Sequence, residues 1–370
     1  MNKRIKILFT IPNFDTAGSG KSVYDMVSGL DKSIFDPQVC CFHDRGELFK
    51  EIKKLNIKIH LFNTSVSYYP LLTFPFRVFK IYKFFKNGGF DIIHSWHWSS
   101  DFSEPLAAKL AGIPFIYTKK AMGWGNKAWL WRSKLSTKII SVNKEIPERF
   151  FNNMINKVII IPLCVDVKRF SPLKKTYKSP EGLIFEKEDF IIISVANLAP
   201  VKGIEILLDA VVRLNDKTIK VLIVGDNNNE YGKDLISNYK DFSNIFFLGK
   251  HLDVRPYLAL ADLFVIPTKD EGRKEGLPIA PMEAMSSKRI VLGSDITGIR
   301  EVLKSFPDFL FISGDRDELI SKIVKVKEMS LEERELIANR MRAYVKTNLS
   351  IDLFINEHEA LYKELIGIKN

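Results

Sequence analysis

Short apolar segments rich in β-branched residues alternate with amphipathic segments along the whole chain, and this alternation restricts the possible folds more than any other feature. Most of these segments are continuously apolar, which is typical of parallel strands covered by helices on both faces. In the first half they are Ile5–Thr10, Pro37–Phe42, Ile57–Leu61, Asp91–His94, Phe115–Tyr117, Lys138–Ser141 and Val158–Ile161. In the second half they are Phe190–Val195, Ile219–Val224, Ile245–Leu248, Leu263–Pro267, Ile290–Leu292 and Phe309–Phe311. The pattern predicts an α/β protein with doubly wound parallel sheets.

The two runs of strands predict two domains, as does a length of 370 residues at about 150 residues per domain. Residues 169–189 are rich in Lys, Glu, Pro and Ser and lack periodicity, which favours a linker. We therefore expect an N-terminal domain at 1–168, a second domain at 190–348 and a C-terminal helix at 349–370 that packs back on the first domain. Ligands of such sheets bind beyond the carboxyl ends of the strands, so both domains are expected to face a central cleft.

Composition excludes a collagen, a coiled coil and a wholly disordered chain. Hydrophobic residues make up 46% and charged residues 27%, as in globular proteins. The apolar stretch Ile5–Ile11 is too short for a signal peptide. Cys40 and Cys41 are adjacent, and neither they nor Cys164 lies in a metal-binding spacing, so we expect a reduced cytoplasmic compartment without structural zinc.

The excess of positive over negative charge is confined to the first half of the chain. Residues 1–165 contain 24 basic and 12 acidic side chains, whereas the remainder contains 31 and 32. A one-sided basic domain favours an anionic surface or polyanion as partner, and both an anionic lipid surface and a nucleic acid fit that charge.

The segment Gly18-Ser19-Gly20-Lys21-Ser22 after the first strand looks like the end of a Walker A loop. That motif requires a glycine five residues before Gly20, and Asp15 stands there instead. A nucleotide hydrolase is therefore disfavoured. Two simpler interpretations remain: the glycines let backbone N–H groups approach a phosphate, or they form an ordinary strand-to-helix turn.

A second segment, Asn197-Leu198-Ala199-Pro200-Val201-Lys202-Gly203, follows the first strand of the second domain and opens a helix. A cation at a helix start is unfavourable for the helix dipole, so Lys202 makes sense if an anion binds there. The alternative is a solvated lysine.

A third segment carries two carboxylates, Glu275 and Glu283, separated by seven residues around a helix start. They could accept hydrogen bonds from the vicinal hydroxyls of a ribose or a sugar, act as general acid and base, or be ordinary acidic residues of a first helical turn. A fourth segment, His94-Ser95-Trp96-His97-Trp98, ends a strand in a loop whose imidazoles and indoles suit a carbohydrate or acyl acceptor. A buried core histidine is the alternative for each.

With these segments in place, nearly the whole chain resembles the retaining GT-B glycosyltransferases of glycosyltransferase family 4 (glycosyl transferases group 1). The most specific element is EGLPIAPMEAM after ADLFVIPT, which contains Glu275 and Glu283. Supporting elements are NLAPVKGIEILLDA, VLIVGD, FFLGK, IPLCVDVKRFSP, and DIIHSW followed by LAAKLAGIPFIYT. The resemblance implies a GT-B fold of two Rossmann-like domains, with the nucleotide-sugar donor bound mainly by the second.

The resemblance also implies roles for individual residues on the donor side. Lys202 would hold the diphosphate, and Asn197 stands where most relatives have arginine. Glu283 would bind the ribose hydroxyls and Glu275 the donor sugar. The backbone N–H groups of Gly276 and Leu277 would lie near the sugar and its phosphate. From the other domain, the donor phosphates would be covered by Gly18, Ser19 and Gly20.

On the acceptor side, the resemblance places a sugar-contacting histidine at His94 or His97. The second position of the family's His-x-His segment is Trp96 here, and His97 is favoured as the catalytic or sugar-contacting group. Lys119 and Lys120 could line an acceptor channel. The family transfers sugars with retention, without a cofactor, and no metal is expected.

The stretch Phe74–Lys86 spaces Arg77, Lys80, Lys83 and Lys86 three residues apart with aromatic residues between them. Such an amphipathic segment can lie on an anionic bilayer, or it can pack its aromatic side on the sheet with a solvated basic face.

Together these features predict a metal-independent hexosyltransferase that uses a UDP-sugar, or next a GDP-sugar, and a lipid-linked or polysaccharide acceptor. Its expected place is the cytoplasm, on the inner face of the cell membrane, in the synthesis of bacterial lipopolysaccharide or capsule, with no nucleic acid partner. The alternatives are a non-catalytic basic module that binds nucleic acid or membrane, and a sugar-nucleotide epimerase on the same fold.

Overall fold

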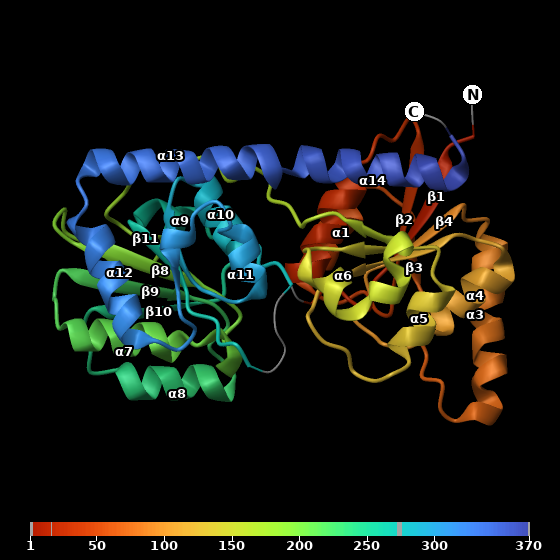
Figure 1. Cartoon of the computed structure of the whole chain (residues 1–370), viewed down its shortest axis with the longest axis horizontal. Helices are drawn as coiled ribbons and strands as arrows, with labels where there is room; N and C mark the ends of the chain where they lie inside the picture. Colours follow the sequence, from red (N-terminus) through yellow and green to blue (C-terminus); the bar gives the residue numbers. More distant parts are fainter. Residues whose placement is uncertain (1–2, 16, 272–275, 369–370) are drawn as a thin grey trace. The chain divides into compact units, whose positions relative to one another are not determined.

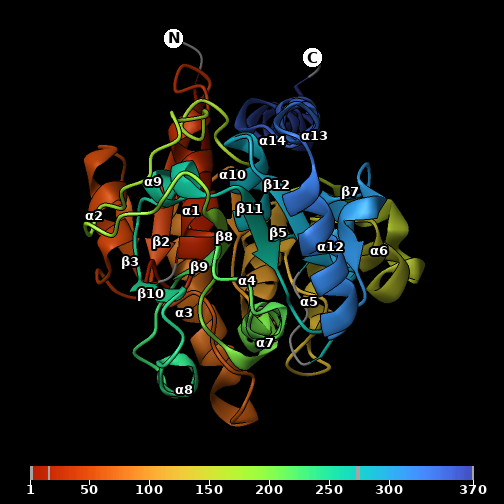
Figure 2. The same cartoon turned by 90° about the vertical axis from the view of Figure 1, so that its left-hand side faces the viewer.

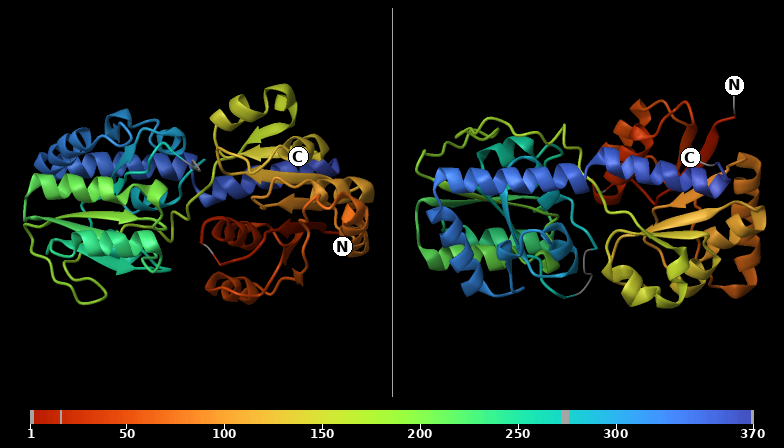
Figure 3. Two further views of the ribbon diagram at one scale, coloured as in Figure 1. Left: turned by 90° about the horizontal axis from the view of Figure 1, so that it is seen from below. Right: turned by 45° about the horizontal axis from the view of Figure 1, so that its top comes forward.

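The computed structural model describes residues 3–15, 17–271 and 276–368, and the chain divides into two units. Unit 1 comprises Met1–Leu163 and Ile351–Asn370, and unit 2 comprises Cys164–Ser350. Each unit is built on its own parallel sheet with helices on both sides (Figure 1 and Figure 3). The expected pair of doubly wound parallel sheets is confirmed.

The sheet of unit 1 has the order β3-β2-β1-β4-β5-β6-β7 in the described chain. Its strands are β1 (Ile5–Thr10), β2 (Phe35–Cys41), β3 (Ile59–Leu61), β4 (Ile92–Ser95), β5 (Phe115–Lys119), β6 (Lys138–Ser141) and β7 (Val158–Ile160). Its helices are α1 (Ala17–Gly29), α2 (Glu47–Lys54), α3 (Phe74–Gly88), α4 (Ser103–Ala111), α5 (Trp129–Leu135), α6 (Glu145–Phe150) and α14 (Ile351–Ile366). Consecutive residues Ile7, Leu8 and Phe9 of β1 are fully buried, because helices cover the sheet on both faces.

The sheet of unit 2 has the order β10-β9-β8-β11-β12-β13. Its strands are β8 (Phe190–Val195), β9 (Ile219–Val224), β10 (Ile245–Gly249), β11 (Leu263–Ile266), β12 (Ile290–Ser294) and β13 (Leu310–Phe311). Its helices are α7 (Ile204–Leu214), α8 (Glu230–Tyr239), α9 (Arg255–Leu260), α10 (Ala280–Ser286), α11 (Thr297–Val302), α12 (Arg316–Glu328) and α13 (Leu331–Asn348). Figures 1 and 2 show α7 and α8 on one face of this sheet and α9, α10 and α13 on the other.

The last helix, α14, is separated from the rest of unit 1 by the whole of unit 2 in the sequence, yet it packs against α1. A Cβ atom on Gly29 of α1 would lie 2.8 Å from the Ile355 side chain, so the two helices approach closely there. The carboxylate of Glu359 accepts a hydrogen bond of 2.8 Å from the backbone N–H of Asp31. This helix therefore supplies part of the core of unit 1.

The structure differs from the expected linker at 169–189, because these residues and residues 164–168 belong to unit 2. Phe170 and Phe185 are buried, and Lys175 forms an ion pair with Asp262 just before β11. These contacts hold residues 169–189 on unit 2, although the charged composition of the stretch resembles that of a linker. In the described ranges, no helix combines the length and apolar character needed to cross a bilayer.

Candidate active site

Each sheet has one point at which the strand order reverses. In unit 1 it lies between β1 and β4, and in unit 2 between β8 and β11. Loops that leave two neighbouring strands at such a point run in opposite directions and leave a crevice beyond their carboxyl ends, where doubly wound folds bind ligands. Most of the predicted site residues of each domain follow these four strands.

In unit 2, Lys202 ends a short 3-10 helix (Pro200–Lys202) between β8 and α7. Gly203 follows in the left-handed conformation (φ 62°), and a Cβ atom there would lie 2.3 Å from the carbonyl oxygen of Pro267 at the end of β11. The backbone N–H of Lys269 also donates to the carbonyl of Val201 over 2.8 Å. The loop that carries Lys202 is therefore held against the end of the neighbouring strand, and only glycine fits at its turn.

Glu283 lies in the first turn of α10 and is half-buried. Gly276 and Leu277, in the segment before this helix, are buried, whereas Asn197 after β8 is exposed. Glu275 falls outside the described residues. The loops after β8 and β11 thus bring Lys202 and the Gly276–Glu283 segment to the same switch point, which two neighbouring strands define.

Beside this point is a depression of about 370 Å³ whose lining includes Glu205, Lys269 and Arg316. The Lys269 ammonium lies 2.5 Å from Glu205 and 3.5 Å from Glu271. The hydrogen bond with Glu205 raises the pKa of Lys269, so this lysine stays charged but is largely neutralised by its neighbours. Neither Lys269 nor Glu205 stands out in the sequence, since a charged residue near a strand end is unremarkable until its partner is known.

In unit 1, Gly18, Ser19 and Gly20 lie in the first turn of α1. Lys21 forms an ion pair of 3.0 Å with Asp25 one turn later, so its ammonium is committed within the helix. This pairing argues against the Walker A interpretation, in which the lysine must reach a phosphate. The first-turn N–H groups of α1 lack partners within the helix, as at any helix start.

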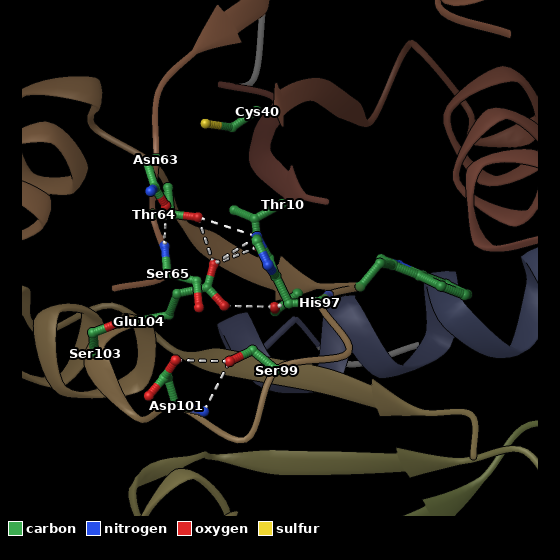
Figure 4. Close-up of polar contacts among 12 residues, drawn as sticks. Thr10, Cys40, Asn63, Thr64, Ser65, His97, Ser99, Asp101, Ser103 and Glu104 are labelled. Atoms are coloured by element: carbon green, nitrogen blue, oxygen red, sulfur yellow. Dashed lines mark hydrogen bonds and ion pairs between the residues drawn. The ribbon is translucent and has the colours of Figure 1, made fainter. Parts of the chain in front are cut away.

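A buried carboxylate that the sequence did not reveal organises the switch point of unit 1 (Figure 4). Glu104, in the first turn of α4, accepts hydrogen bonds of 2.7 Å from Thr10 at the end of β1 and 2.7 Å from Thr64 after β3. Its other oxygen accepts from Ser95 at the end of β4 over 2.8 Å and from Arg132 of α5 over 3.0 Å. Both Glu104 and Arg132 are completely buried. We call this set of five residues the Glu104 cluster.

His97 lies against the Glu104 cluster with its side chain only 1% exposed. Its Nε2 atom is 3.6 Å from the Glu104 carboxylate and 3.4 Å from the Thr64 hydroxyl. Burial lowers the pKa of His97 to about 4, with the opposing effect of Glu104 partly offset by Arg132 and Lys120. His97 is therefore neutral at physiological pH.

His94 and Trp96, expected on the acceptor side, lie in the core of unit 1 instead and are completely buried. His94 Nδ1 pairs with the Tyr362 hydroxyl of α14 over 2.7 Å, and Nε2 pairs with the Thr118 hydroxyl of β5 over 2.9 Å. Because both ring nitrogens have protein partners, His94 has none left for a sugar. These contacts disfavour an acceptor-side role for His94, whereas for Trp96 the structure shows only burial, and both roles stay predictions.

Lys119 and Lys120 end β5 with their ammonium groups directed to backbone carbonyls. The Lys119 ammonium donates to the Gly123 carbonyl and lies 3.8 Å from the centre of the Trp124 ring. Lys120 donates to the Trp96 carbonyl over 2.5 Å. Lys119 is buried and Lys120 half-buried, so Lys120 is the better placed of the two to meet a ligand.

The basic stretch forms α3, which buries Phe74, Val78, Ile81 and Phe85 on the domain. Several other apolar residues of α3 and of the segment before it are exposed. We call these exposed residues the apolar tip: Tyr69, Leu71, Leu72, Phe76 and Phe79. Leu72 is 90% exposed and Phe76 is 73% exposed. One side of α3 thus packs on the domain and another presents bulky apolar groups to solvent. Contact with a bilayer stays a prediction.

The basic residues of α3 differ in their surroundings. Lys80, Lys83 and Lys86 are exposed. Arg77 instead donates to the carbonyls of Ser67 over 2.6 Å and Pro70 over 2.9 Å, inside the segment that precedes α3. Arg77 therefore stabilises the backbone of the apolar tip, and its guanidinium is hydrogen-bonded within the protein.

Comparison with known proteins relates both halves of the chain to glycosyltransferases. The family profile described as "Glycosyltransferase Family 4" matches residues 16–169, and that described as "Glycosyl transferases group 1" matches residues 177–344. The chain is 27% identical over 309 residues to the Escherichia coli UDP-Gal:alpha-D-GlcNAc-diphosphoundecaprenol alpha-1,3-galactosyltransferase, which covers 75% of this chain and 78% of that one. It is 25% identical over 377 residues to the Campylobacter jejuni N,N'-diacetylbacillosaminyl-diphospho-undecaprenol alpha-1,3-N-acetylgalactosaminyltransferase, covering 94% and 97%. Among solved structures, a glycosyltransferase from Rickettsia africae superimposes with a TM-score of 0.82 at 21% identity over 99% of this chain and all of that one.

Proposed function

The chain belongs to the group 1 glycosyltransferases, and from this membership we propose that it moves a hexosyl group from a nucleotide-diphosphate sugar to a lipid-linked acceptor in the assembly of bacterial surface glycans. UDP is the first choice of donor nucleotide and GDP the second. Two relatives support this choice, because the name of one specifies UDP-Gal as donor and the names of both specify a diphosphoundecaprenol-linked sugar.

The observation that carries the proposal is the gathering of Lys202 and the Gly276–Glu283 segment at the switch point of unit 2. A cation that precedes α7 suits a diphosphate, and a half-buried carboxylate at the start of α10 suits the vicinal hydroxyls of a ribose. We assign Lys202 to the diphosphate, Glu283 to the ribose and the backbone N–H groups of Gly276 and Leu277 to the sugar phosphate. Glu275 is assigned to the donor sugar from the family pattern alone.

We propose transfer with retention and without a metal ion. The acceptor oxygen forms a bond to the anomeric carbon on the face from which the diphosphate leaves, the bond between that carbon and the phosphate oxygen breaks, and the leaving phosphate takes the acceptor's proton. Lys202 and the backbone donors stabilise the negative charge that develops on the diphosphate. In the described chain, no group of three or more His, Cys, Asp or Glu side chains is arranged to hold a metal ion.

The experiment is a thermal-shift screen of the purified chain against UDP, GDP, ADP and their sugar conjugates in the presence of EDTA. A ligand at about 100 times its dissociation constant adds about 2.7 kcal/mol of stability. Lys202→Ala and Glu283→Gln should abolish the shift, whereas Lys240→Ala, which removes an exposed lysine at the end of α8, should preserve it. No shift with any nucleotide in a folded sample would refute the donor site.

The stereochemistry is tested separately by NMR of the product formed from a synthetic diphosphate-linked acceptor. A product with the anomeric configuration of the donor supports retention, and an inverted product refutes it. Full activity after exhaustive dialysis against EDTA supports metal independence, and activity restored only by Mg²⁺ or Mn²⁺ refutes it.

We further propose that the apolar tip and the lysines of α3 attach unit 1 to the inner face of the cell membrane. Two exposed leucines that enter the acyl region would contribute about 3 kcal/mol, and each lysine near an anionic surface about 1 kcal/mol. The paired change Leu71→Ser/Leu72→Ser should then lower partitioning onto vesicles that contain anionic lipid about 100-fold. Leu331→Ser/Leu336→Ser, two exposed leucines of α13 in unit 2, is the matched control. Equal partitioning of the two double variants would refute attachment through the tip.

A further inference from the structure

Each oxygen of the Glu104 carboxylate accepts two hydrogen bonds. Thr10 and Thr64 donate to one carboxylate oxygen, and Ser95 and Arg132 donate to the other. These donors come from the ends of β1 and β4, the loop after β3, and α5. A buried carboxylate with this many donors stays ionised: burial acts to raise the pKa of Glu104, but His97, Arg132 and the hydrogen bonds lower it to about 2.

The protons available around His97 determine its tautomer. Thr64 has one hydroxyl proton and donates it to Glu104 over 2.7 Å, so towards His97 its oxygen can only accept. The ionised Glu104 can also only accept. Both groups that face Nε2 are thus acceptors, at 3.4 and 3.6 Å, and a neutral ring must carry its proton on Nε2.

The other ring nitrogen, Nδ1, is then a bare acceptor. None of the described residues hydrogen-bonds to it. Because Nδ1 is not among the fully buried side-chain atoms that lack a partner, it keeps some contact with solvent. The exposed ring of Phe42 lies 5.1 Å from the imidazole centre. The natural partner of a neutral imidazole acceptor is a hydroxyl group.

We propose that Glu104 is a positioning residue which, together with Thr64, holds His97 in the tautomer protonated on Nε2, so that Nδ1 accepts a hydrogen bond from a sugar hydroxyl of the acceptor substrate. This inference rests on the proposed function, in which the acceptor is a sugar and supplies that hydroxyl. It assigns a role to a carboxylate that does not itself touch substrate. Arg132 supports it by neutralising the buried charge of Glu104.

Three charged side chains influence the His97 ring: Glu104, Arg132 and Lys120. The two cations oppose protonation of the ring and the carboxylate favours it. The ring is also sealed from solvent on the Nε2 side, where Glu104 and Thr64 are both fully buried. These surroundings keep the imidazole neutral, which the acceptor role of Nδ1 requires.

The test is the nitrogen-15 NMR spectrum of the histidine side chains in the full chain. The wild type must show His97 as a single tautomer protonated on Nε2. A His97 protonated on Nδ1 would overturn the proposal, and this measurement needs no variant. In Glu104→Gln the new amide can donate as well as accept, and the His97 signals should change to those of a tautomer mixture.

Thr10→Val is the matched control, because it removes one donor to the same carboxylate oxygen but leaves both acceptors that face Nε2. It should leave the His97 signals unchanged. His94 serves as an internal control in every spectrum, since its nitrogens pair with Tyr362 and Thr118. Unchanged His97 signals in a folded Glu104→Gln variant would overturn the proposal.

Steady-state kinetics test whether Nδ1 of His97 binds a hydroxyl of the acceptor. Glu104→Gln should lower kcat/KM for the acceptor about tenfold, the effect of one lost hydrogen bond, with the stabilisation by UDP unchanged. A changed tautomer with unaltered acceptor kinetics would overturn the assignment of Nδ1 to a substrate hydroxyl. Absence of nucleotide binding in the wild type would instead refute the proposed function, so the two failures are distinguishable.

Discussion

Replacement of Arg132 by methionine is the most direct test of the Glu104 cluster, because methionine fills a similar volume without the charge. The guanidinium is completely buried, donates to Glu104 and Ser95, and also donates to the Asp101 carbonyl over 2.8 Å. Removing it leaves the Glu104 carboxylate buried without its cation. Breaking a buried ion pair on one side costs about 3–5 kcal/mol.

The dependence on pH distinguishes this cause from a simple packing defect. The pKa of Glu104 is about 2 when folded against an ordinary value of 4.5, and one pKa unit corresponds to about 1.4 kcal/mol. A lowered folded pKa contributes stability that is present above pH 4.5 and is lost as the pH falls towards 2, here about 3 kcal/mol in total. In Arg132→Met the pKa of Glu104 rises, because one of the groups that lower it is removed, while His97 and the threonine hydrogen bonds remain. The stability gap between wild type and variant should therefore narrow by up to about 2 kcal/mol between pH 7 and pH 3.

The assay is urea unfolding followed by tryptophan fluorescence. All five tryptophans lie between Trp96 and Trp131, so the signal reports unit 1 alone. Arg45→Met, which removes an exposed arginine of the same unit, is the control and should change stability little at either pH. A gap between Arg132→Met and wild type that stays the same at both pH values would refute the electrostatic explanation.

Three further predictions follow from other contacts. Tyr362→Phe leaves Nδ1 of His94 buried without its hydrogen-bond partner. The free energy of unfolding of unit 1 should fall by about 1–3 kcal/mol in the same fluorescence assay. An effect near zero would contradict the structural role of His94. Gly225→Ala places a Cβ atom 1.9 Å from the Ala196 carbonyl oxygen and so displaces the loop before Asn197. This change should weaken UDP binding in the thermal-shift assay. Gly123→Ala, where the new Cβ atom meets open space, should leave UDP binding unchanged. Arg77→Ala releases the carbonyls of Ser67 and Pro70 and should reduce vesicle binding more than Lys80→Ala does, and the reverse order would show that charge alone governs attachment.

The sequence was sufficient for the sheets, and the structure brings the predicted donor-side residues Lys202 and Glu283 to one switch point. Their role in donor binding stays a prediction. A continuous apolar strand such as β8 (Phe190–Val195) is recognisable without its neighbours, since burial on both faces demands apolar residues throughout. Lys202 was recognisable because a cation at a helix start contradicts the dipole and so calls for an anion. Both patterns depend only on neighbouring residues in the sequence, so they can be recognised without the tertiary structure.

The acceptor side depends on contacts that no local pattern contains. Glu104 looks like an ordinary acid in the first turn of a helix, and only its burial beside Arg132, 28 residues away, shows otherwise. His94 looks like a loop-facing residue at a strand end, but its partner Tyr362 lies 268 residues away on α14. The same limitation applies to residues 169–189, whose charged composition conceals two buried phenylalanines.

The two switch points offer different chemistry to a ligand, and under the proposed function this difference suits the two substrates of a sugar transfer. At the switch point of unit 2, a lysine and a carboxylate lie within reach of solvent, as a charged nucleotide diphosphate with hydroxyl groups requires. At the switch point of unit 1, the charges of Glu104 and Arg132 are sealed inside the domain and cancel each other, so that the neighbouring His97 offers a neutral acceptor. Under the two proposals above, a neutral Nδ1 atom orients one hydroxyl of the acceptor sugar, and the hydroxyl that reacts gives its proton to the departing phosphate. The buried ion pair would then serve the transfer by keeping the His97 ring neutral.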